Sequence, residues 1–509
     1  MRHAAPFRQR RWHGASLGGQ RRMKGASTSR SRGKRPQQLL LVAGLALLLS
    51  LAACQQRLPG AQAGPSDAPA TPAVAATAPP TTNTTATPPP ETPDTPTPAT
   101  TGATPTPTGA PQQPSPTLPA PTYAGPYAMA EAHCGVHLPV LAMAPDATQD
   151  PLPAPSLAAF PEEVRPALAH LFEHPQQVAL AAYEVGREDE GIYLNADTPV
   201  PLASVVKVIH LVAYAQAVQN GVLNEEAPVP LSEMERYFLP GSDLGAHSAG
   251  LNMLREEERV LDEPPAILLQ DVPRLMVEYS SNAATDYVHM LLGQEHIEQT
   301  AVDLGLAQQT APCPFLGQFL LMGRNGADVS QVETLLQEPE VYSRDVVQLT
   351  ERFSTDPAFR QETRIWRDRS TRPSLQAQAL FSNQLSTRGS ARAYAALMAR
   401  IATNDLGPWE QNVRIRRYLE WPTHIPVNQE KLAWLGYKGG SLPGVLTVVY
   451  YAQPWDRAHP VVVALFFHDL PLDTYRQWRR SLPHDELARW LLREREAIPT
   501  LRALLDQDV

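Results

Sequence analysis

Cysteine is scarce in this chain, with only 3 residues among 509. None of them is spaced from another cysteine or from a histidine as metal ligands usually are, so the sequence predicts no metal site and no cofactor. Cys134 and Cys313 fall in or next to the part of the chain that is expected to fold. In an oxidising compartment they could form one disulfide, or they could remain two buried thiols.

The chain also lacks a long apolar run. The longest one, LLLVAGLALLLSLAAC at residues 39–54, is short for a membrane span, which needs about 20 residues. Eleven Lys/Arg and no acidic residue precede it. A basic flank, a short apolar core and small residues are typical of a secretory signal, which we expect over residues 1–53. Met23 would give a leader of more ordinary length, so translation could also start there.

The end of this run, Leu51-Ala52-Ala53-Cys54, resembles the lipobox of bacterial lipoproteins. The resemblance implies that Cys54 is diacylated and becomes the first residue of an extracytoplasmic, lipid-anchored protein. Two acyl chains suffice for stable anchoring where one is marginal. The alternative is an ordinary signal peptide that ends near a cysteine by chance.

Positive charge is in short supply after this leader. Without residues 1–53, 32 basic side chains (43 minus 11) accompany 52 acidic ones, a formal net charge near −20. So acidic a chain is a poor partner for nucleic acid or for anionic lipid. We therefore expect a small-molecule or peptide ligand, and contact with the membrane only through the lipid on Cys54.

Large apolar side chains are almost absent from residues 54–126, which are rich in proline, threonine and alanine. A stretch such as ATPPPETPDTPTPAT cannot bury enough surface to offset its chain entropy. The sequence therefore predicts a disordered tether, extending about 3.1 Å per residue where it is polyproline-like. Residues 127–160 are expected to form a lead-in, and residues 161–509 a single domain.

That domain is expected to begin with a strand hairpin, residues 176–185 and 192–197. Residues 204–221 are apolar nearly all round and stop at Gly221, the pattern of a buried helix with a glycine C-cap. Further predicted elements are helical stretches at 272–292 and 386–402, strands at 444–454 and 459–470, and a helix at 485–505. This order predicts an α+β fold in which both chain ends join one antiparallel sheet and a helical block lies between them.

Ser204 and Lys207 stand at the first turn of the buried helix. Residues at i and i+3 share a helix face, so the lysine amine can reach the serine oxygen. The helix N-terminus favours a developing alkoxide, and burial lowers the pKa of the lysine, so it could act as a base near neutral pH. Ser-x-x-Lys alone is a weak signal, because it also occurs at Ser31 and Lys34 in the leader. A helix N-cap is the structural alternative for Ser204.

Three motifs occur in the order PLASVVK, YSSNAATDYV and YKGGS. They resemble the Ser-x-x-Lys, Ser-x-Asn and Lys-Thr-Gly motifs of class A β-lactamases and penicillin-binding serine enzymes. The resemblance runs from about Gln176 to the end of the chain and implies a β-lactamase/transpeptidase-like fold. It implies that Ser204 is acylated, that Lys207 is its base, and that Ser280 relays a proton to the leaving nitrogen.

The same resemblance assigns substrate-binding residues. Asn282 would hold the lysine and the substrate, Lys438 would attract a substrate carboxylate, and Gly440 and Ser441 would belong to the substrate-binding strand. The backbone N–H groups of Ser204 and Ser441 stand where the family forms its oxyanion hole, usually the largest electrostatic contribution in acyl transfer. A polar helix face and a glycine turn are the structural alternatives for these two motifs.

The sequence departs from the family pattern in several places. Gly439 stands where the third motif has threonine, and the following strand carries no arginine for the substrate carboxylate. Glu338, in QEPEVY, resembles the deacylating glutamate of the family's Glu-Pro-Glu-Leu-Asn loop, but it follows Ser280 by 58 residues, a longer interval than in the family. A solvated loop acid is the alternative. The whole span 305–383 is longer than in the family and rich in charge.

The expected function is cleavage of a β-lactam amide by a serine hydrolase of the class A type, through an acyl-enzyme. A D-Ala-D-Ala peptidase or transpeptidase of the cell wall would use the same chemistry on a peptidoglycan peptide. A wall-binding module with a degenerate site is the non-enzymatic alternative, which the complete set of polar motif residues disfavours. The protein is expected to be a monomer.

Overall fold

The computed structural model describes residues 134–135, 150–153, 155–306, 308–325, 328–369 and 372–506. The predicted leader, the lipidated Cys54 and the tether 54–126 lie outside the described residues. Among the helices that are described, none combines the length and the apolar character needed to cross a bilayer.

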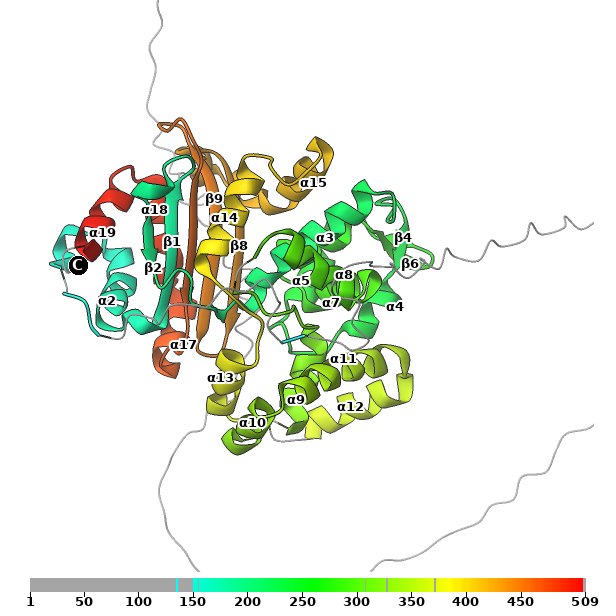
Figure 1. Ribbon diagram of the computed structural model, residues 1–509. Coiled ribbons are helices and arrows are strands. Elements are labelled where there is room, and N and C mark those ends of the chain that lie inside the picture. Colours follow the sequence, from blue (N-terminus) through cyan, green and yellow to red (C-terminus); the bar gives the residue numbers. More distant parts are fainter. Residues whose placement is uncertain are drawn as a thin grey trace, which may run out of the picture. The chain divides into compact units, whose positions relative to one another are not determined.

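A five-stranded antiparallel sheet joins the two ends of the folded chain (Figure 1). Its strands are β1 (Val178–Glu184), β2 (Ile192–Leu194), β8 (Leu432–Leu442), β9 (Val445–Pro454) and β10 (Val461–Phe467). The order is β2-β1-β10-β9-β8, so the first hairpin pairs with the last strands, with Val178 opposite Phe467. The predicted α+β fold, with both chain ends in one antiparallel sheet, is confirmed.

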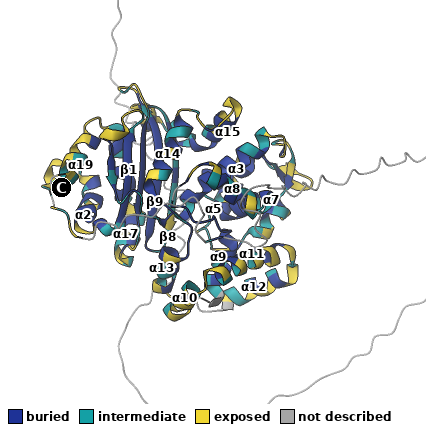
Figure 2. Cartoon of the chain, in the orientation of Figure 1, coloured by how far each residue is buried: buried dark blue, intermediate teal, exposed yellow. Residues whose placement is uncertain are grey.

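The central strand β10 separates two hydrophobic cores, because side chains in a strand point alternately to opposite faces. Its residues 461, 463, 465 and 467 pack with α2 (Arg165–Glu173), α18 (Pro483–Arg493) and α19 (Ala497–Leu505). Its residues 462, 464 and 466 pack with α3 (Lys207–Gln219) and α14 (Ala391–Ala402) on the other face. Figure 2 shows the sheet as largely buried, whereas the helices on both sides of it also carry exposed residues.

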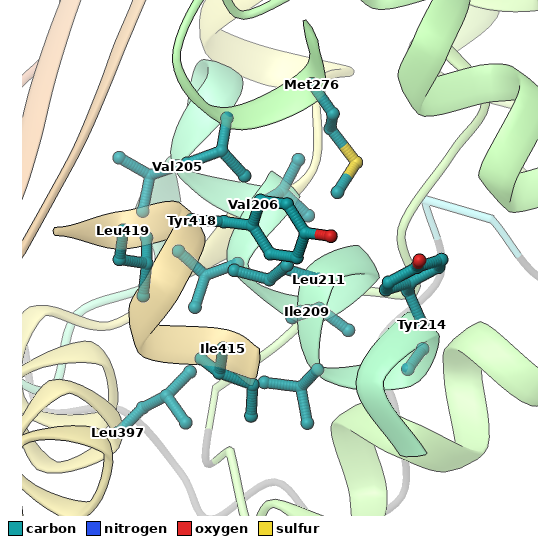
Figure 3. Close-up of a cluster of buried hydrophobic side chains, with 14 of the residues drawn as sticks. Val205, Val206, Ile209, Leu211, Tyr214, Met276, Leu397, Ile415, Tyr418 and Leu419 are labelled. Carbon is teal, nitrogen blue, oxygen red and sulfur yellow. The ribbon is translucent and has the colours of Figure 1, made fainter. Parts of the chain in front are cut away.

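Helix α3 is the buried helix that the sequence predicts. It follows a 3₁₀ helix, Ala203–Val206, and ends before Gly221, whose φ of 71° is the left-handed conformation of a glycine C-cap. Figure 3 shows its Ile209 and Leu211 packed with Ile415 of α15 (Trp409–Leu419). Because other helices surround it, its apolar residues occupy every face rather than one stripe.

The remaining helices complete the block and the end of the chain. They are α4 (Leu231–Met234), α5 (Ala246–Glu256), α6 (Asp271–Val277), α7 (Asn282–Leu292), α8 (Gln294–Asp303), α9 (Phe315–Asn325), α10 (Val329–Leu336), α11 (Pro339–Thr355), α12 (Pro357–Arg369), α13 (Leu375–Gln384), α16 (Pro426–Gln429) and α17 (Leu472–Ser481). Two small sheets are formed by β3 (Val200–Pro201) with β7 (Arg388–Gly389), and by β4 (Pro228–Pro230), β6 (Pro265–Leu268) and β5 (Leu261–Asp262).

Two predicted helical stretches are divided in the structure. Residues 272–292 form α6 and α7, because Ser280 takes a φ of 63° and Ser281 accepts the N–H of Ala284 as the N-cap of a new helix. Residues 485–505 belong to α18 and α19, which are separated at Glu494, an extended residue. Pro499 then falls in the first turn of α19, where a missing N–H costs nothing.

The two cysteines of the described residues lie in one hydrophobic cluster. Cys134 and Cys313 are both buried and both carry free thiols, packed with Tyr342 and Phe381. The structure therefore has the second of the two arrangements that the sequence allows.

Candidate active site

Ser204 lines a cavity of about 210 Å³, which we call the nucleophile cavity. Its backbone is fixed from both sides: the Leu202 N–H donates to the Thr387 carbonyl at 2.9 Å, and the Thr447 hydroxyl of β9 donates to the Leu202 carbonyl at 2.8 Å. Ala203, the residue before Ser204, has a φ of 48°, a conformation that non-glycine residues rarely adopt. The tight turn into the 3₁₀ helix thus holds the serine where the sheet meets the helical block.

Lys207 is fully buried one turn after Ser204. Its amine donates to the Ser280 carbonyl at 2.6 Å, to the Asn282 amide oxygen at 2.8 Å and to the Ser280 hydroxyl at 3.2 Å. Ser204 is not among these partners of the Lys207 amine, so the direct hydrogen bond that the sequence suggests is not formed in the described structure. Both motifs nonetheless converge on one amine, as the sequence predicts.

Burial lowers the pKa of Lys207 from its ordinary value to about 7, although the charges of Asp243 and Asp286 act in the opposite direction. Near neutral pH a large part of the amine is therefore uncharged and able to accept a proton. An ordinary lysine would be almost wholly protonated under these conditions.

A pH dependence follows. Because only the neutral amine is a base, acylation of Ser204 should accelerate as the pH rises through about 7 and level off above it. Below that pH the rate should fall about tenfold per pH unit, as expected for a single titrating base. Stopped-flow acylation by a penicillin between pH 5 and pH 9 measures this profile, and a flat profile would contradict the assignment of Lys207.

Ser280 lies between two lysines. Its hydroxyl oxygen accepts from Lys207 at 3.2 Å and from Lys438 at 3.0 Å. Lys438 is buried as well, and burial together with the Lys207 charge lowers its pKa well below the ordinary value. The left-handed backbone at Ser280 is supported by the next residue, because the Ser281 hydroxyl lies 2.9 Å from Nδ1 of buried His247. Such a hydroxyl can pass a proton between either amine and a reacting atom.

Strand β8 passes directly beside Ser204. A Cβ on Gly440 would lie 2.7 Å from the Ser204 nitrogen and 2.8 Å from the Leu202 carbonyl oxygen, so only glycine permits this approach. At Gly439 the neighbour is a side chain, because a Cβ there would lie 2.1 Å from the Tyr437 hydroxyl and could be accommodated only if Tyr437 moved. With Tyr437 in this position, the threonine of the family motif would not fit. The Ser441 hydroxyl lies 3.1 Å from that of Tyr475.

The space beyond Lys207 is occupied by Phe315, whose ring centroid lies 4.8 Å from the Lys207 amine. The start of α9 is held there by the buried Asp286, whose carboxylate accepts the N–H groups of Phe315 and Leu316 at 2.8 and 2.7 Å. Burial raises the pKa of Asp286 to about 7. An apolar ring therefore stands beside the lysine, and Asp286 is engaged in fixing it.

Glu338 is placed elsewhere. It is exposed, lies at the N-cap of α11, and is not among the residues that line the nucleophile cavity. Its carbonyl accepts the N–H of Tyr342, an ordinary first-turn contact. In the structure Glu338 is therefore a solvent-exposed acid, which is the alternative that the sequence allowed for QEPEVY.

The structure brings the other predicted residues together. Ser204, Ser280, Asn282, Gly440 and Ser441 line the nucleophile cavity, and Lys207 and Lys438 are both hydrogen-bonded to Ser280 beside it. The lysines and serines of the three motifs, although far apart in sequence, therefore form one cluster.

Three residues of this cavity have no counterpart in the sequence prediction. Asp243 is the single carboxylate among the residues lining it, and its two oxygens accept the N–H groups of Gly245 and His247. Arg479 reaches the cavity from α17, and His484 from α18. Arg479 is thus an arginine at the cavity, although it comes from a helix and not from the strand after the third motif. None of the three lies near a motif in sequence, so no spacing rule could have identified them.

Metal ligation is not suggested by the part of the chain that the structure describes, where no group of three His, Cys, Asp or Glu side chains is arranged to hold an ion. The nucleophile cavity instead offers the hydroxyls of Ser204 and Ser280 with two lysine amines beside them, and Asp243, Arg479 and His484 on its wall.

Comparison with known families adds to this picture. The model of a family described as the β-lactamase enzyme family matches residues 163–483. No curated protein matches the sequence.

Several solved structures are similar at low sequence identity. A β-lactamase from Sphaerobacter thermophilus is 16% identical, with a TM-score of 0.38, covering 64% of this chain and 92% of that chain. A β-lactamase from Burkholderia vietnamiensis is 13% identical, with a TM-score of 0.39, and the match covers 65% of this chain and 97% of that chain. A β-lactamase from Xanthomonas campestris is 12% identical, with a TM-score of 0.37, and the match covers 61% of this chain and 91% of that chain.

Proposed function

Because the chain belongs to the β-lactamase enzyme family, we propose that it is a serine hydrolase that opens the amide of a β-lactam through an acyl-enzyme on Ser204, in the manner of class A. The observation that supports this most directly is the position of the Ser280 hydroxyl between the amines of Lys207 and Lys438. A binding module would have no use for two buried lysines whose pKa values are both lowered.

Acylation begins when neutral Lys207 takes the proton of the Ser204 hydroxyl, directly or through Ser280. The Ser204 oxygen then attacks the amide carbon, and the backbone N–H groups of Ser204 and Ser441 stabilise the oxyanion. The C–N bond breaks as Ser280 passes a proton from Lys207 to the leaving nitrogen. An ester to Ser204 remains, and Lys207 is neutral again.

Turnover requires a water molecule to attack this ester. The water gives one proton to a base, the bond from the acyl carbon to the Ser204 oxygen breaks, and the serine hydroxyl is restored. Asp243 and His484 line the nucleophile cavity, and Lys207 and Lys438 lie beside it, so these are the groups from which such a base could come. The rate of this second step decides between a lactamase and an enzyme that penicillins inhibit.

The second candidate is a D-Ala-D-Ala peptidase or transpeptidase of the cell wall. It is favoured by the exposed position of Glu338 and by the length of the site, since cavities adjoin the nucleophile cavity on two sides. A β-lactam would fill the central part alone, whereas a peptide would extend into the neighbouring cavities.

Intact-protein mass spectrometry after incubation with benzylpenicillin tests both candidates. We expect the mass of one whole penicillin to be added, on the peptide that contains Ser204. An adduct that disappears within seconds, with accumulation of hydrolysed penicillin, supports the lactamase. A persistent adduct supports the peptidase, and the absence of both adduct and hydrolysis would refute the proposed function.

We also propose that the protein is anchored by lipid on Cys54, on the strength of the lipobox-like sequence Leu51–Cys54. In a bacterial host the wild-type protein should partition into the detergent phase of a Triton X-114 extract. Cys54→Ser should remain unprocessed or move to the aqueous phase, since it has no thiol to acylate. Mature wild-type protein that retains residues before Cys54 would contradict this proposal.

A further inference from the structure

The nucleophile cavity adjoins a larger cavity of about 280 Å³, which we call the arginine cavity. Both are lined by Ser242, Leu244, Phe319, Ser441, Leu442 and Arg479. A substrate bound at Ser204 could therefore extend past Ser441 into the arginine cavity.

Its walls combine positive charge with apolar surface. Arg367 of α12, Arg372 and Arg479 line it, and no aspartate or glutamate does. Trp366, Phe319 and Tyr475 supply aromatic surface. Arginine binds carboxylates through paired N–H donors, and aromatic walls favour a planar group next to that carboxylate.

These arginines form no salt bridge with a carboxylate among the described residues. Nη1 of Arg367 is buried without a hydrogen-bond partner. The pKa of Arg367 is lowered by burial and by the charge of Arg372, although the charge of Asp368 acts in the opposite direction. Positive charges that lie close together without a salt-bridge partner favour the binding of an anion in this cavity.

The two ends of the site differ in the part of a substrate they can receive. Ser280 lines the nucleophile cavity and a third cavity on the Lys438 side, whereas Ser441 lines the nucleophile cavity and the arginine cavity. In the proposed mechanism Ser280 protonates the leaving nitrogen, so the leaving group lies toward Lys438. The acyl part must then extend in the other direction, past Ser441.

We propose that the arginine cavity is a subsite for the acyl end of the substrate and that it binds a carboxylate carried next to an aromatic or apolar group. The inference rests on the proposed function and specifies its substrate class. It also gives a role to the long, charge-rich span 305–383, because residues of its helices α9, α12 and α13 line the cavity. These three helices lie at the bottom of the view in Figure 1.

Two thioesters that differ only at the remote end test the subsite. They are N-(4-carboxybenzoyl)-D-alanyl thioglycolate and its 4-carbamoylbenzoyl counterpart, compared by kcat/KM for thiolate release. We expect the wild type to prefer the carboxylate by about tenfold or more, the scale of a charge-assisted hydrogen bond. In Arg367→Gln/Arg372→Gln this preference should fall to about twofold or less, with the rate on the carbamoyl substrate unchanged.

Arg344→Gln is the matched control, because Arg344 is an exposed arginine of α11 paired with Asp345 and does not line the arginine cavity. It should retain the full preference. A wild type without preference, or a double variant that keeps it, would overturn the subsite.

A binding measurement separates this inference from the proposed function. Calorimetry of Ser204→Ala with N-(4-carboxybenzoyl)-D-alanine needs no acyl transfer. We expect binding that weakens with salt and is lost when Arg367→Gln/Arg372→Gln is added. Binding without any acylation of the wild type would refute the proposed function and keep the subsite, whereas acylation without binding or preference would refute the subsite alone.

Discussion

Ser204→Ala should abolish covalent labelling by benzylpenicillin altogether while leaving thermal unfolding nearly unchanged. The Ser204 hydroxyl faces the nucleophile cavity, so its removal deletes the acylated atom without opening a hole in the hydrophobic core. Peptide mapping of the wild-type adduct should identify Ser204 and no other serine. Labelling that survives in the alanine variant would mean that another nucleophile reacts.

Lys207→Ala should slow the same labelling by about 10²-fold or more, the scale of losing a positioned general base. Its effect on folding has to be measured too, because the variant leaves the Ser280 carbonyl and the Asn282 amide oxygen without their donor. Lys431→Ala is the control: Lys431 is an exposed lysine paired with Glu494, and its loss should alter neither rate nor unfolding.

The second large effect concerns turnover, for which we expect a burst. Acylation has all the groups it needs, but the apolar ring of Phe315 stands next to Lys207, and Glu338 lies outside the nucleophile cavity. A chromogenic cephalosporin should therefore release about one equivalent of product rapidly and then turn over slowly. Glu338→Gln should reproduce the wild-type trace within error, because a solvated acid cannot activate water at a distant ester.

Two other outcomes would be informative. A Glu338→Gln variant that acylates fast and traps the ester would show that the segment carrying Glu338 closes over the site, against its position in this structure. Rapid steady hydrolysis by wild type and variant alike would mean that another base is present. Asp243→Asn would then be the variant to measure, since Asp243 is the carboxylate that lines the nucleophile cavity.

The sequence predicts the sheet and the buried helix well, because both are marked by long, mainly apolar stretches. Strands β9 and β10 are such stretches, and α3 is followed by Gly221, whose left-handed φ fits a helix C-cap. The break between α6 and α7 is harder to foresee. Ser280 adopts its left-handed backbone where Lys207, Lys438 and, through Ser281, His247 all contact the turn, and these partners come from distant elements.

The same distinction applies to the site. Ser204, Lys207, Ser280 and Lys438 could be predicted because short motifs carry them in a fixed order. Arg479, Asp243 and Phe315 could not, because each reaches the site through the packing of a separate helix or loop. Glu338 shows the opposite error: its local text resembles a family motif, but it lies between α10 and α11, away from the nucleophile cavity.

The contact between Gly440 and the Ser204 backbone has a consequence for biogenesis. Ser204 precedes Ser441 by 237 positions, so the proposed oxyanion hole cannot form until residues 432–442 have been made and have docked as the edge strand β8. A chain that is still being synthesised or exported cannot be acylated, however complete its helical block. The onset of penicillin labelling in a pulse-chase experiment would therefore report when folding is complete, that is, when the two ends of the domain have joined in one sheet.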